Sequence, residues 1–477
     1  MDGSAPIRLP TDVKVVNVGL PGFGDAVRSQ GVEAADVEWR IPAGGRPELV
    51  AALTRLSGPL NDVVSAANDE VLRRIGGSPM LVGIARCIDV VPGMTPRTVL
   101  HCGPAVEWPD MCDPLRRSIR ATVVAEGWSA DVGDVPELVG SGSVHFAPAN
   151  AHNAVLPMAT AIGPTAPVLV VDNEAAGTKA FSSINQGPGQ VPWFGADSPE
   201  AVERLRMIRD VVAPVLAETL ESSGPIDVFA HAAQGLLMGD EMHMRSQATT
   251  NLLWRTLLPH LLSVHSSQRV EAARFLSRNH LFFLNVAMAA AKAVLMSAHD
   301  VPGSSVVVGM SRNGTTFGIK LAGIPDEEFL APAPGVDRAL YHPGFSEEVA
   351  APDIGDSAVL ELVGLGGAAA AASPAVAAFL GGSVADAVAT TDAMDLVCVG
   401  RSSRFALPLL DHRGCPLGVD ARAVVELQTA PAINTGILHA TDGTGQIGAG
   451  VARAPLECFE QAVLSLDRSL DGLSDAT

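Results

Sequence analysis

Short polar runs rich in glycine interrupt a mostly apolar sequence, and they contain most of the side chains that could do chemistry. Residues 311–314 combine the guanidinium group of Arg312 with the amide of Asn313, followed by Gly314. Arginine binds carboxylates and phosphates through paired N–H donors, so this run is the best candidate for an anion site. Residues 239–243 bring together acidic groups and a histidine, but their spacing matches no metal-binding motif, so we predict no metal.

Eight such runs occur along the chain. Each one alone is more often a turn or a helix cap than a binding site, but together they exceed what turns require. The candidate site residues in these runs are Asn153, Asn173, Asn185, Gln234, Asp240, Glu241, His243, Arg312, Asn313, Gly314, Asp356, Ser357, Asn434 and Thr435.

Two glycine-rich segments could bring backbone N–H groups close to a phosphate. Residues 19–24 follow a predicted strand, but their spacing is not G-x-G-x-x-G, and a simple tight turn is favoured. Residues 443–448 match that pattern but lie near the C-terminus without a following βαβ unit. A backbone nest for an anion stays open there, formed by Gly445, Gln446 and Gly448.

Composition narrows the classes of partner. Lys and Arg total 32 against 52 Asp and Glu, a net charge of −20, which disfavours nucleic acid and anionic membranes. The uncharged stretch 362–385 is mostly Gly and Ala, so it predicts a packed segment and not a membrane span. Six scattered cysteines and no visible export signal in residues 1–10 predict a cytoplasmic protein with reduced thiols.

Hydrophobic periodicity predicts an α/β fold with several parallel-sheet domains and a helical middle region. A β–turn–α–β order over residues 13–39 predicts a small parallel-sheet unit at the N-terminus. Divisions are expected at residues 1–95, 96–200, 201–300 and 301–477. The predicted strands are 98–101, 144–147, 168–171, 305–310, 317–321 and 397–399, and the main predicted helices are 47–56, 62–75, 201–220, 242–262, 270–297 and 456–465.

Several of these runs resemble one known family in type and in order. The matching segments are 101–104, 126–128, 234–244 (QGLLMGDEMHM), 282–288 (FFLNVAM), 312–319 (RNGTTFGI), 355–357 (GDS), 364–368 (GLGGA), 433–436 (INTG) and 445–463. The chain is identified from them as a member of the AllG (YlbE/YahG-like) family from about residue 95 onward. Residues 1–95 resemble an added FdrA-type, Rossmann-like module.

The resemblance implies a carbamoyltransferase of purine and allantoin catabolism. The implied reaction is phosphorolysis of oxalurate to oxamate and carbamoyl phosphate, with no cofactor, in a complex with FdrA-like (AllF) and AllH-like subunits or in a homo-oligomer. The substrates are then phosphate and a small anion. Such a site must bind two anions and stabilise an oxyanion.

We expect the catalytic residues to be Glu241, His243, Arg312 and Asn313. Arg312 would bind phosphate or carboxylate, and His243 or Glu241 would carry the proton to the leaving nitrogen. The amides of Asn153, Asn173 and Asn313 would supply donors, and residues 445–450 a backbone nest. No covalent nucleophile is required for this reaction.

Two other functions stay open at this point. The FdrA-like front end is also compatible with acyl or CoA-thioester transfer, and the chain could be a non-catalytic metabolite-binding subunit. Asn150 and Ala151 stand where the family pattern is expected to have histidines, which would permit a different substrate.

Overall fold

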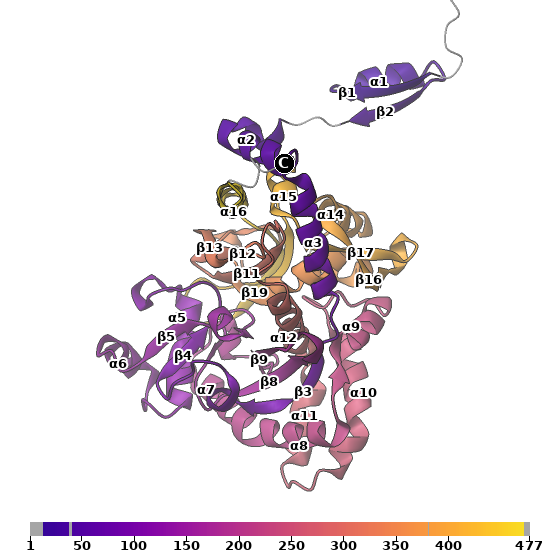
Figure 1. Ribbon diagram of the computed structural model, residues 1–477. Coiled ribbons are helices and arrows are strands. Elements are labelled where there is room, and N and C mark those ends of the chain that lie inside the picture. The colour runs from indigo at the N-terminus through magenta and orange to yellow at the C-terminus, as the bar shows by residue number, and fades with distance from the viewer. Residues whose placement is uncertain (1–12, 38–40, 380, 472–477) are drawn as a thin grey trace, which may run out of the picture.

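The computed structural model describes residues 13–37, 41–379 and 381–471 and has helices packed on several separate sheets (Figure 1). The predicted mixed α/β class is confirmed. Pairing is parallel for three strand pairs, β1–β2, β4–β5 and β6–β9, whereas the remaining described pairs are antiparallel. The sheets are therefore less parallel than the sequence predicted, because short connections join several consecutive strands, and a short turn can join only antiparallel strands.

The N-terminal unit has the predicted order of elements. Its strands β1 (Lys14–Val18) and β2 (Glu33–Val37) pair in parallel around helix α1 (Pro21–Arg28). A Cβ atom at Gly24 would lie 2.0 Å from Asp36 Oδ1, so the glycine permits close packing of the helix on β2. Asp36 accepts a hydrogen bond from Asn17 and forms an ion pair with Arg28, so its carboxylate is bonded within the βαβ unit. Residues 1–12 and 38–40, including the end of the predicted second strand, lie outside the described residues.

Two helices that follow this unit pack against the C-terminal half of the chain. Helix α2 (Pro47–Leu56) contacts α15 (Ala421–Leu427) and α16 (Leu456–Ser469), and α3 (Asn61–Ile75) contacts α12 (Phe282–Ser297). Figure 1 shows α2, α3, α15 and α16 near one another, with α12 below α3. Residues 47–75 thus share a hydrophobic core with the C-terminal elements, and the predicted division near residue 95 stays a prediction.

The largest sheet has the order β10-β3-β8-β9-β6 and is packed against α12. Helix α12 is buried from Phe282 to Leu295, and its many alanines allow close approach to β8 and β9. The strands are β3 (Met80–Arg86), β6 (Ala154–Val155), β8 (Pro167–Asn173), β9 (Thr178–Ser183) and β10 (Ile226–Asp227).

The other sheets are small and flank this core. A three-stranded sheet contains β4 (Thr98–His101), β5 (His145–Pro148) and β7 (Ala161–Ile162), with α5 (Asp113–Ala125) packed on it. The C-terminal part has three sheets. The first contains β11 (Val307–Asn313), β12 (Thr316–Leu321), β13 (Ile324–Pro332) and β15 (Ile354–Gly355). The second contains β14 (Val336–Tyr341), β18 (Ala432–Leu438) and β19 (Gln446–Arg453), and the third contains β16 (Cys398–Leu407) and β17 (Arg413–Val419).

The helical middle region is present, but three predicted helices have different bounds. Its helices are α7 (Pro199–Met207), α8 (Ala213–Ser223), α9 (Val228–Leu237), α10 (Gln247–Ser263) and α11 (Arg269–Arg278). The helix predicted over 201–220 is two α-helices joined by a π-helical segment (Ile208–Val212). The helix predicted from residue 242 begins only at Gln247, because Met242 has a left-handed backbone (φ 76°). The helix predicted over 270–297 is two helices, α11 and α12, bent by 82° at the break.

The remaining α-helices in the described part of the chain are three short ones and a 13-residue helix that packs against β17. They are α4 (Cys87–Val90), α6 (Val135–Gly140), α13 (Pro374–Phe379) and α14 (Val384–Leu396). Of the uncharged stretch 362–385, residues 362–373 are buried as predicted, whereas residues 381–385 are exposed. Among the described residues, no single helix is long and apolar enough to cross a bilayer; the bent pair α11 and α12 passes only on combined length and composition.

Asn68 links α3 to the C-terminal half and gives a test of this packing. Its side-chain oxygen accepts hydrogen bonds from Ser304 Oγ (2.8 Å) and Ser305 N (2.9 Å), and its amide donates to Ser305 Oγ (3.0 Å). Asn68→Ala leaves these buried groups unpaired, so we expect a loss of about 1–3 kcal/mol in the free energy of unfolding. The measurement is denaturant unfolding against Asp69→Ala, an exposed change on the same helix. Equal stability of the two variants would contradict the docking of α3.

Candidate functional site

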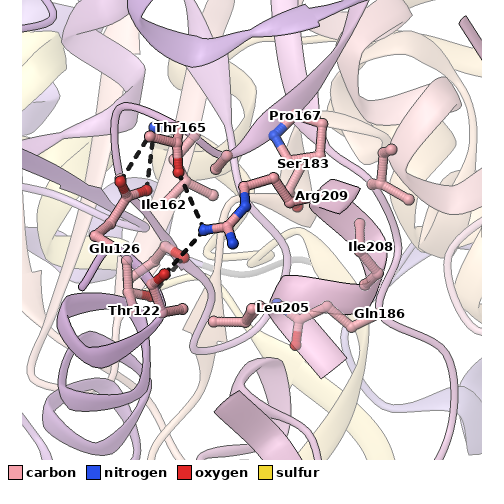
Figure 2. A pocket seen from close by; sticks show the side chains of 15 residues that line it. Thr122, Glu126, Ile162, Thr165, Pro167, Ser183, Gln186, Leu205, Ile208 and Arg209 are labelled. Carbon is pink, nitrogen blue, oxygen red and sulfur yellow. Dashed lines mark hydrogen bonds between the residues drawn. The ribbon is translucent and has the colours of Figure 1, made fainter. Parts of the chain in front are cut away.

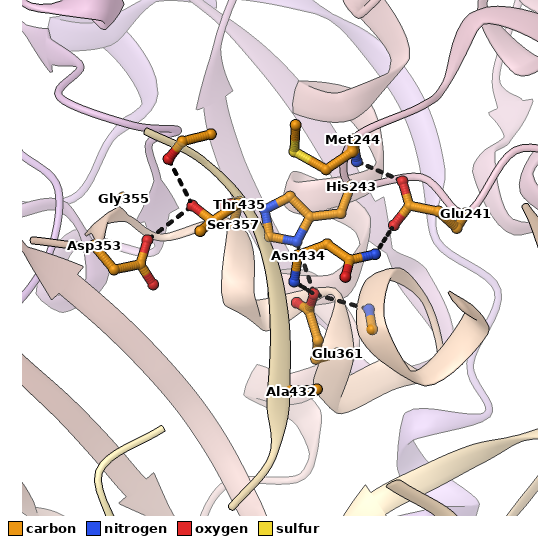
Figure 3. A network of polar contacts seen from close by, with 12 residues as sticks. Glu241, His243, Met244, Asp353, Gly355, Ser357, Glu361, Ala432, Asn434 and Thr435 are labelled. Carbon is orange, nitrogen blue, oxygen red and sulfur yellow. Dashed lines mark hydrogen bonds and ion pairs between the residues drawn. The ribbon is translucent and has the colours of Figure 1, made fainter. Parts of the chain in front are cut away.

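A buried hydroxyl, imidazole and carboxylate lie in a row at the junction of three segments (Figure 3). His243 Nε2 is 2.7 Å from Ser357 Oγ, and His243 Nδ1 is 2.7 Å from Glu361 Oε1. An ionised carboxylate can only accept, which places the ring proton on Nδ1 and leaves Nε2 to accept the Ser357 hydroxyl. This is the arrangement of a nucleophile or proton donor, a general base and the acid that orients the base. We call these three residues the Ser–His–Glu row.

Glu361 is fixed by backbone donors as well as by the imidazole. Its Oε1 also accepts hydrogen bonds from Gly367 N (3.0 Å) and Asn434 N (3.3 Å). A Cβ atom at Gly366 would lie 2.2 Å from this oxygen, so only glycine leaves room for the carboxylate. Oε2 of Glu361 has no hydrogen-bond partner among the described residues. The carboxylate is therefore anchored through one oxygen.

The loop between α9 and α10 presents His243 to this row. Glu241 accepts hydrogen bonds from Arg245 N (2.8 Å) and from Asn434 Nδ2 (2.9 Å). Asp240 accepts from Thr249 N (2.7 Å) and Thr249 Oγ1 (2.8 Å). Burial raises the pKa of Glu241. Because Glu241 is bonded to the loop backbone and to β18, and Asp240 to the first turn of α10, both side chains hold the loop in place, and His243 is better placed than Glu241 to move a proton.

Arg312 lies beside Ser357 but is already paired. Its Nε and Nη2 donate to the two oxygens of Asp353 (2.8 and 3.0 Å), and its Nη1 donates to Gly355 O (2.6 Å). Nη1 lies 3.5 Å from Ser357 Oγ. Thr435 Oγ1 donates to Asp353 as well (2.8 Å). The guanidinium group of Arg312 is fully buried, and its charge is paired with Asp353. It is therefore not free to bind a substrate anion directly, contrary to the expectation from the sequence.

The turn that contains Ser357 is fixed by the residues before it. Asp356 accepts hydrogen bonds from Gly103 N (2.7 Å) and Leu156 N (2.8 Å), and burial raises its pKa to about 7. A Cβ atom at Gly355 (φ +116°) would lie 2.3 Å from Met158 N, so this position requires glycine. Ser357 is held firmly where it meets His243.

The other predicted residues lie elsewhere. Asn313 donates to Pro104 O (3.0 Å), and its Oδ1 accepts from Thr315 N and Thr316 N (2.9 and 2.6 Å), which closes the turn at Gly314 (φ +80°). Asn185 pairs with Asn285 of α12 (2.8 Å).

Three further amides are dispersed. Asn173 is buried at the end of β8, Asn153 has a left-handed backbone (φ 57°), and Gln234 is exposed on α9. The predicted site residues that the structure brings together are Asp240, Glu241, His243, Arg312, Asp356, Ser357, Asn434 and Thr435.

The predicted backbone nest at residues 445–450 is wrong for most of its length. Strand β19 is the central strand of its sheet, with Gly448 opposite both Ile437 and Tyr341 and Gly450 opposite Thr435 and Ala339. Its backbone N–H groups therefore lie in the sheet ladder, and Gln446 Nε2 donates to Gly448 O (3.1 Å). Gly445 O, just before the strand, accepts from His439 N (2.9 Å).

Sequence reasoning missed three charged residues that lie in or near the site: Asp353, Glu361 and Lys292. A signal for two of them was present, because Glu361 is a lone charge in a long apolar stretch and Lys292 is the one charged residue of α12. Lys292 Nζ donates to Asn150 O (3.1 Å), and burial lowers its pKa to about 8. Charges in apolar runs are rare, so their presence points to function or to a specific partner.

A separate hollow lies next to Glu126 and Arg209 (Figure 2). Its cavity volume is about 40 Å³. Glu126 accepts hydrogen bonds from Thr165 N (3.1 and 3.3 Å), and burial raises its pKa. Arg209 donates to Asp210, Ala125 O and Thr165 Oγ1. This mostly apolar hollow suits a small uncharged group better than an anion.

A second hollow has the opposite character. Three arginines, Arg204, Arg274 and Arg278, line it together with Glu271 and Phe275. Arg204 lies over the Phe275 ring (5.7 Å to its centroid) and donates to Gln186 O (2.6 Å). Positive charge gathered here in a chain of net charge −20 can attract small anions. No group of three or more His, Cys, Asp or Glu side chains suited to a metal ion occurs in the described part of the chain.

Fold and site together define a mixed α/β protein with a buried Ser–His–Glu row, and comparisons with known proteins identify its family. The family model "Oxamate carbamoyltransferase subunit AllG" matches residues 144–357. The chain is 36% identical over 456 residues to the uncharacterized protein YahG of Escherichia coli (strain K12), covering 95% of this chain and 96% of that one. It is 40% identical over 378 residues to the oxamate carbamoyltransferase subunit AllG of the same organism, covering 78% and 90%.

A solved structure is also similar. It is the crystal structure of a conserved protein of unknown function from Enterococcus faecalis V583, with a TM-score of 0.84 and 35% sequence identity, covering 86% of this chain and 99% of that one. The chain belongs to the AllG family, in agreement with the resemblance of its sequence motifs.

The buried Lys292 predicts a pH dependence of stability. Its pKa is lowered from 10.5 to about 8, so the folded chain releases this proton at lower pH than the unfolded chain does. Between these two values the unfolded state binds more protons, so the contribution of Lys292 to stability rises with pH. At lower pH the buried charge destabilises the fold by up to roughly 3 kcal/mol.

Lys292→Met removes this charge. We expect its advantage in stability over the wild type to be largest below pH 8 and to shrink toward pH 10.5, as measured by denaturant unfolding across that range. Lys179→Met, at an exposed lysine, is the control. A difference that does not change with pH would show that Lys292 titrates like an exposed lysine.

Proposed function

We propose that this chain supplies the acid–base centre of a carbamoyltransferase that converts a ureido acid such as oxalurate and phosphate into oxamate and carbamoyl phosphate. The observation that carries the proposal is the buried Ser–His–Glu row, with His243 between Ser357 and Glu361. Membership of a family that includes an oxamate carbamoyltransferase subunit supports the choice of reaction.

The reaction needs a proton at the leaving nitrogen. Expulsion of an amide anion is prohibitively slow, and a positioned acid that protonates the nitrogen contributes typically 10²–10⁴-fold. His243 is suited to this task because its hydrogen bond to Glu361 (2.7 Å) fixes the orientation of the ring beside Ser357. Proton transfer then passes along Ser357 Oγ or directly from Nε2 to the substrate.

Negative charge that develops on the carbonyl oxygen also needs stabilisation. Arg312 Nη1 donates to Gly355 O and lies 3.5 Å from Ser357 Oγ, whereas Nε and Nη2 donate to Asp353. We assign to Arg312 the stabilisation of this charge and the positioning of the 353–357 turn, in place of direct phosphate binding.

The partners belong to the same proposal. A relative in the family is described as a subunit, and by analogy this chain works in the cytoplasm with FdrA-like and AllH-like subunits or with further copies of itself. Residues 1–95, which lie outside the matched family segment and include the N-terminal βαβ unit, are the part proposed to correspond to an FdrA-like module.

The direct test follows carbamoyl phosphate by phosphorus NMR. The full chain is mixed with oxalurate and phosphate, with and without the proteins encoded beside it. We expect a carbamoyl phosphate signal from the wild type and a rate lower by roughly a hundredfold or more for His243→Gln, which cannot transfer a proton.

His231→Gln is the matched control, because His231 is also hydrogen-bonded on both ring nitrogens (to Asp227 O and Thr256 Oγ1). It should keep the wild-type rate. A folded His243→Gln variant with full activity would show that His243 takes no part in the reaction. If the wild type gives no carbamoyl phosphate signal in any mixture, oxalurate is not the substrate.

A further inference from the structure

Ser357 has the surroundings of an activated nucleophile. Its Oγ lies 2.7 Å from His243 Nε2, and the same ring lies 2.7 Å from Glu361 through its other nitrogen. A serine hydroxyl becomes a strong nucleophile when an adjacent base takes its proton as it attacks, and an orienting carboxylate stabilises the resulting imidazolium. The buried Ser182, by contrast, has a carbonyl oxygen as the partner of its hydroxyl, since its Oγ donates to Val155 O (2.7 Å).

The position of Ser357 is fixed by the two residues before it. Asp356 is held by Gly103 N and Leu156 N, and the preceding Gly355 is locked against Met158. Arg312 Nη1 lies 3.5 Å from Ser357 Oγ, where it can stabilise an oxyanion formed next to the hydroxyl. Nucleophile, base, orienting acid and a cationic donor thus meet at one point. Ser357 and Glu361 come from one short segment, whereas His243 and Arg312 come from segments far away in the sequence.

We propose that Ser357 carries the carbamoyl group covalently during transfer, so that the reaction proceeds by double displacement. The inference rests on the proposed function for the identity of the group, but the nucleophilic character of Ser357 is independent of it. A one-step attack by phosphate would need no aligned serine and base.

The two half-reactions balance. In the first, Ser357 Oγ attacks the ureido carbonyl carbon while its proton passes to His243 Nε2. The carbon–nitrogen bond then breaks, and His243 returns the proton to the nitrogen, so that oxamate leaves as a neutral amide group. In the second, a phosphate oxygen attacks the carbamoyl ester, and the carbon–Oγ bond breaks. The phosphate proton returns through His243 to Ser357, which releases carbamoyl phosphate.

The first experiment looks for the carbamoyl-enzyme directly. The full chain, with its neighbouring proteins present, is incubated with carbamoyl phosphate, quenched in acid, and examined by intact-mass and peptide mass spectrometry. We expect a mass increase of one carbamoyl group, mapped to Ser357. The adduct should be lost in Ser357→Ala and kept in Ser182→Ala, a buried serine without a base.

A second experiment needs no variant, so it is informative even where Ser357→Ala fails to fold. Wild-type protein is incubated with oxalurate and isotopically labelled oxamate in the absence of phosphate. Double displacement predicts that label enters oxalurate, because the carbamoyl-enzyme forms and reverses without phosphate. Turnover with phosphate but without exchange and without an adduct would overturn the covalent role and leave the proposed function standing.

A serine-directed fluorophosphonate separates the remaining outcomes. If Ser357 is labelled in a protein that makes no carbamoyl phosphate from oxalurate, the result supports Ser357 as a nucleophile and refutes oxalurate as the substrate. Absence of labelling, of the adduct and of exchange would assign Ser357 a purely structural hydrogen bond to His243.

Discussion

The burial of ionised groups is the constraint on which the site depends. The Arg312–Asp353 pair is fully buried, and removing one partner of such a pair typically destabilises a protein by about 3–5 kcal/mol. The pair is compatible with the fold only because Gly355 O and Thr435 Oγ1 complete its hydrogen bonds. Since these partners belong to β15 and β18, the ion pair holds two separate sheets in a fixed relation next to Ser357.

The same requirement explains the loop that carries His243. A loop between two helices leaves backbone N–H groups unpaired, and here Asp240 and Glu241 accept them. Asn434 of β18 then ties Glu241 to the sheet and also donates its backbone N–H to Glu361. The acidic residues that look catalytic in the sequence thus hold the imidazole in place, and the imidazole is the group free to exchange a proton.

Much of the fold could be predicted because local signals decided it. The helix predicted over residues 47–56 is α2, since a proline at its start and a regular apolar spacing define both face and boundary. The late start of α10 at Gln247 could not be predicted, because it depends on the left-handed backbone of Met242 and on long-range bonds of Glu241. Antiparallel pairing was missed because apolar runs do not reveal strand direction.

In the site too, features set by local sequence could be predicted, whereas features set by distant contacts could not. Polar runs with glycine pointed to His243 and Ser357, which lie in a loop and a turn that direct their side chains into the core. They also pointed to Asn434, which lies within strand β18. Glu361 and Asp353 were missed, since their importance comes from partners more than forty residues away or from another sheet. Amides such as Gln234 and Asn185 fit the same sequence pattern yet lie exposed on a helix or paired within the core. Pattern alone cannot separate a turn from a site when the deciding contacts are distant.

The central claim is that His243 is the acid–base group of a carbamoyl-transfer site, and nitrogen NMR of the imidazole tests it most directly. With ¹⁵N-histidine incorporated into the full chain and its partners present, the His243 resonances can be assigned by their loss in His243→Gln. The account predicts a single tautomer protonated at Nδ1, and a change in the His243 signals, but not in those of His231, when oxamate and phosphate are added. Unchanged His243 signals at saturating concentrations of both would contradict it.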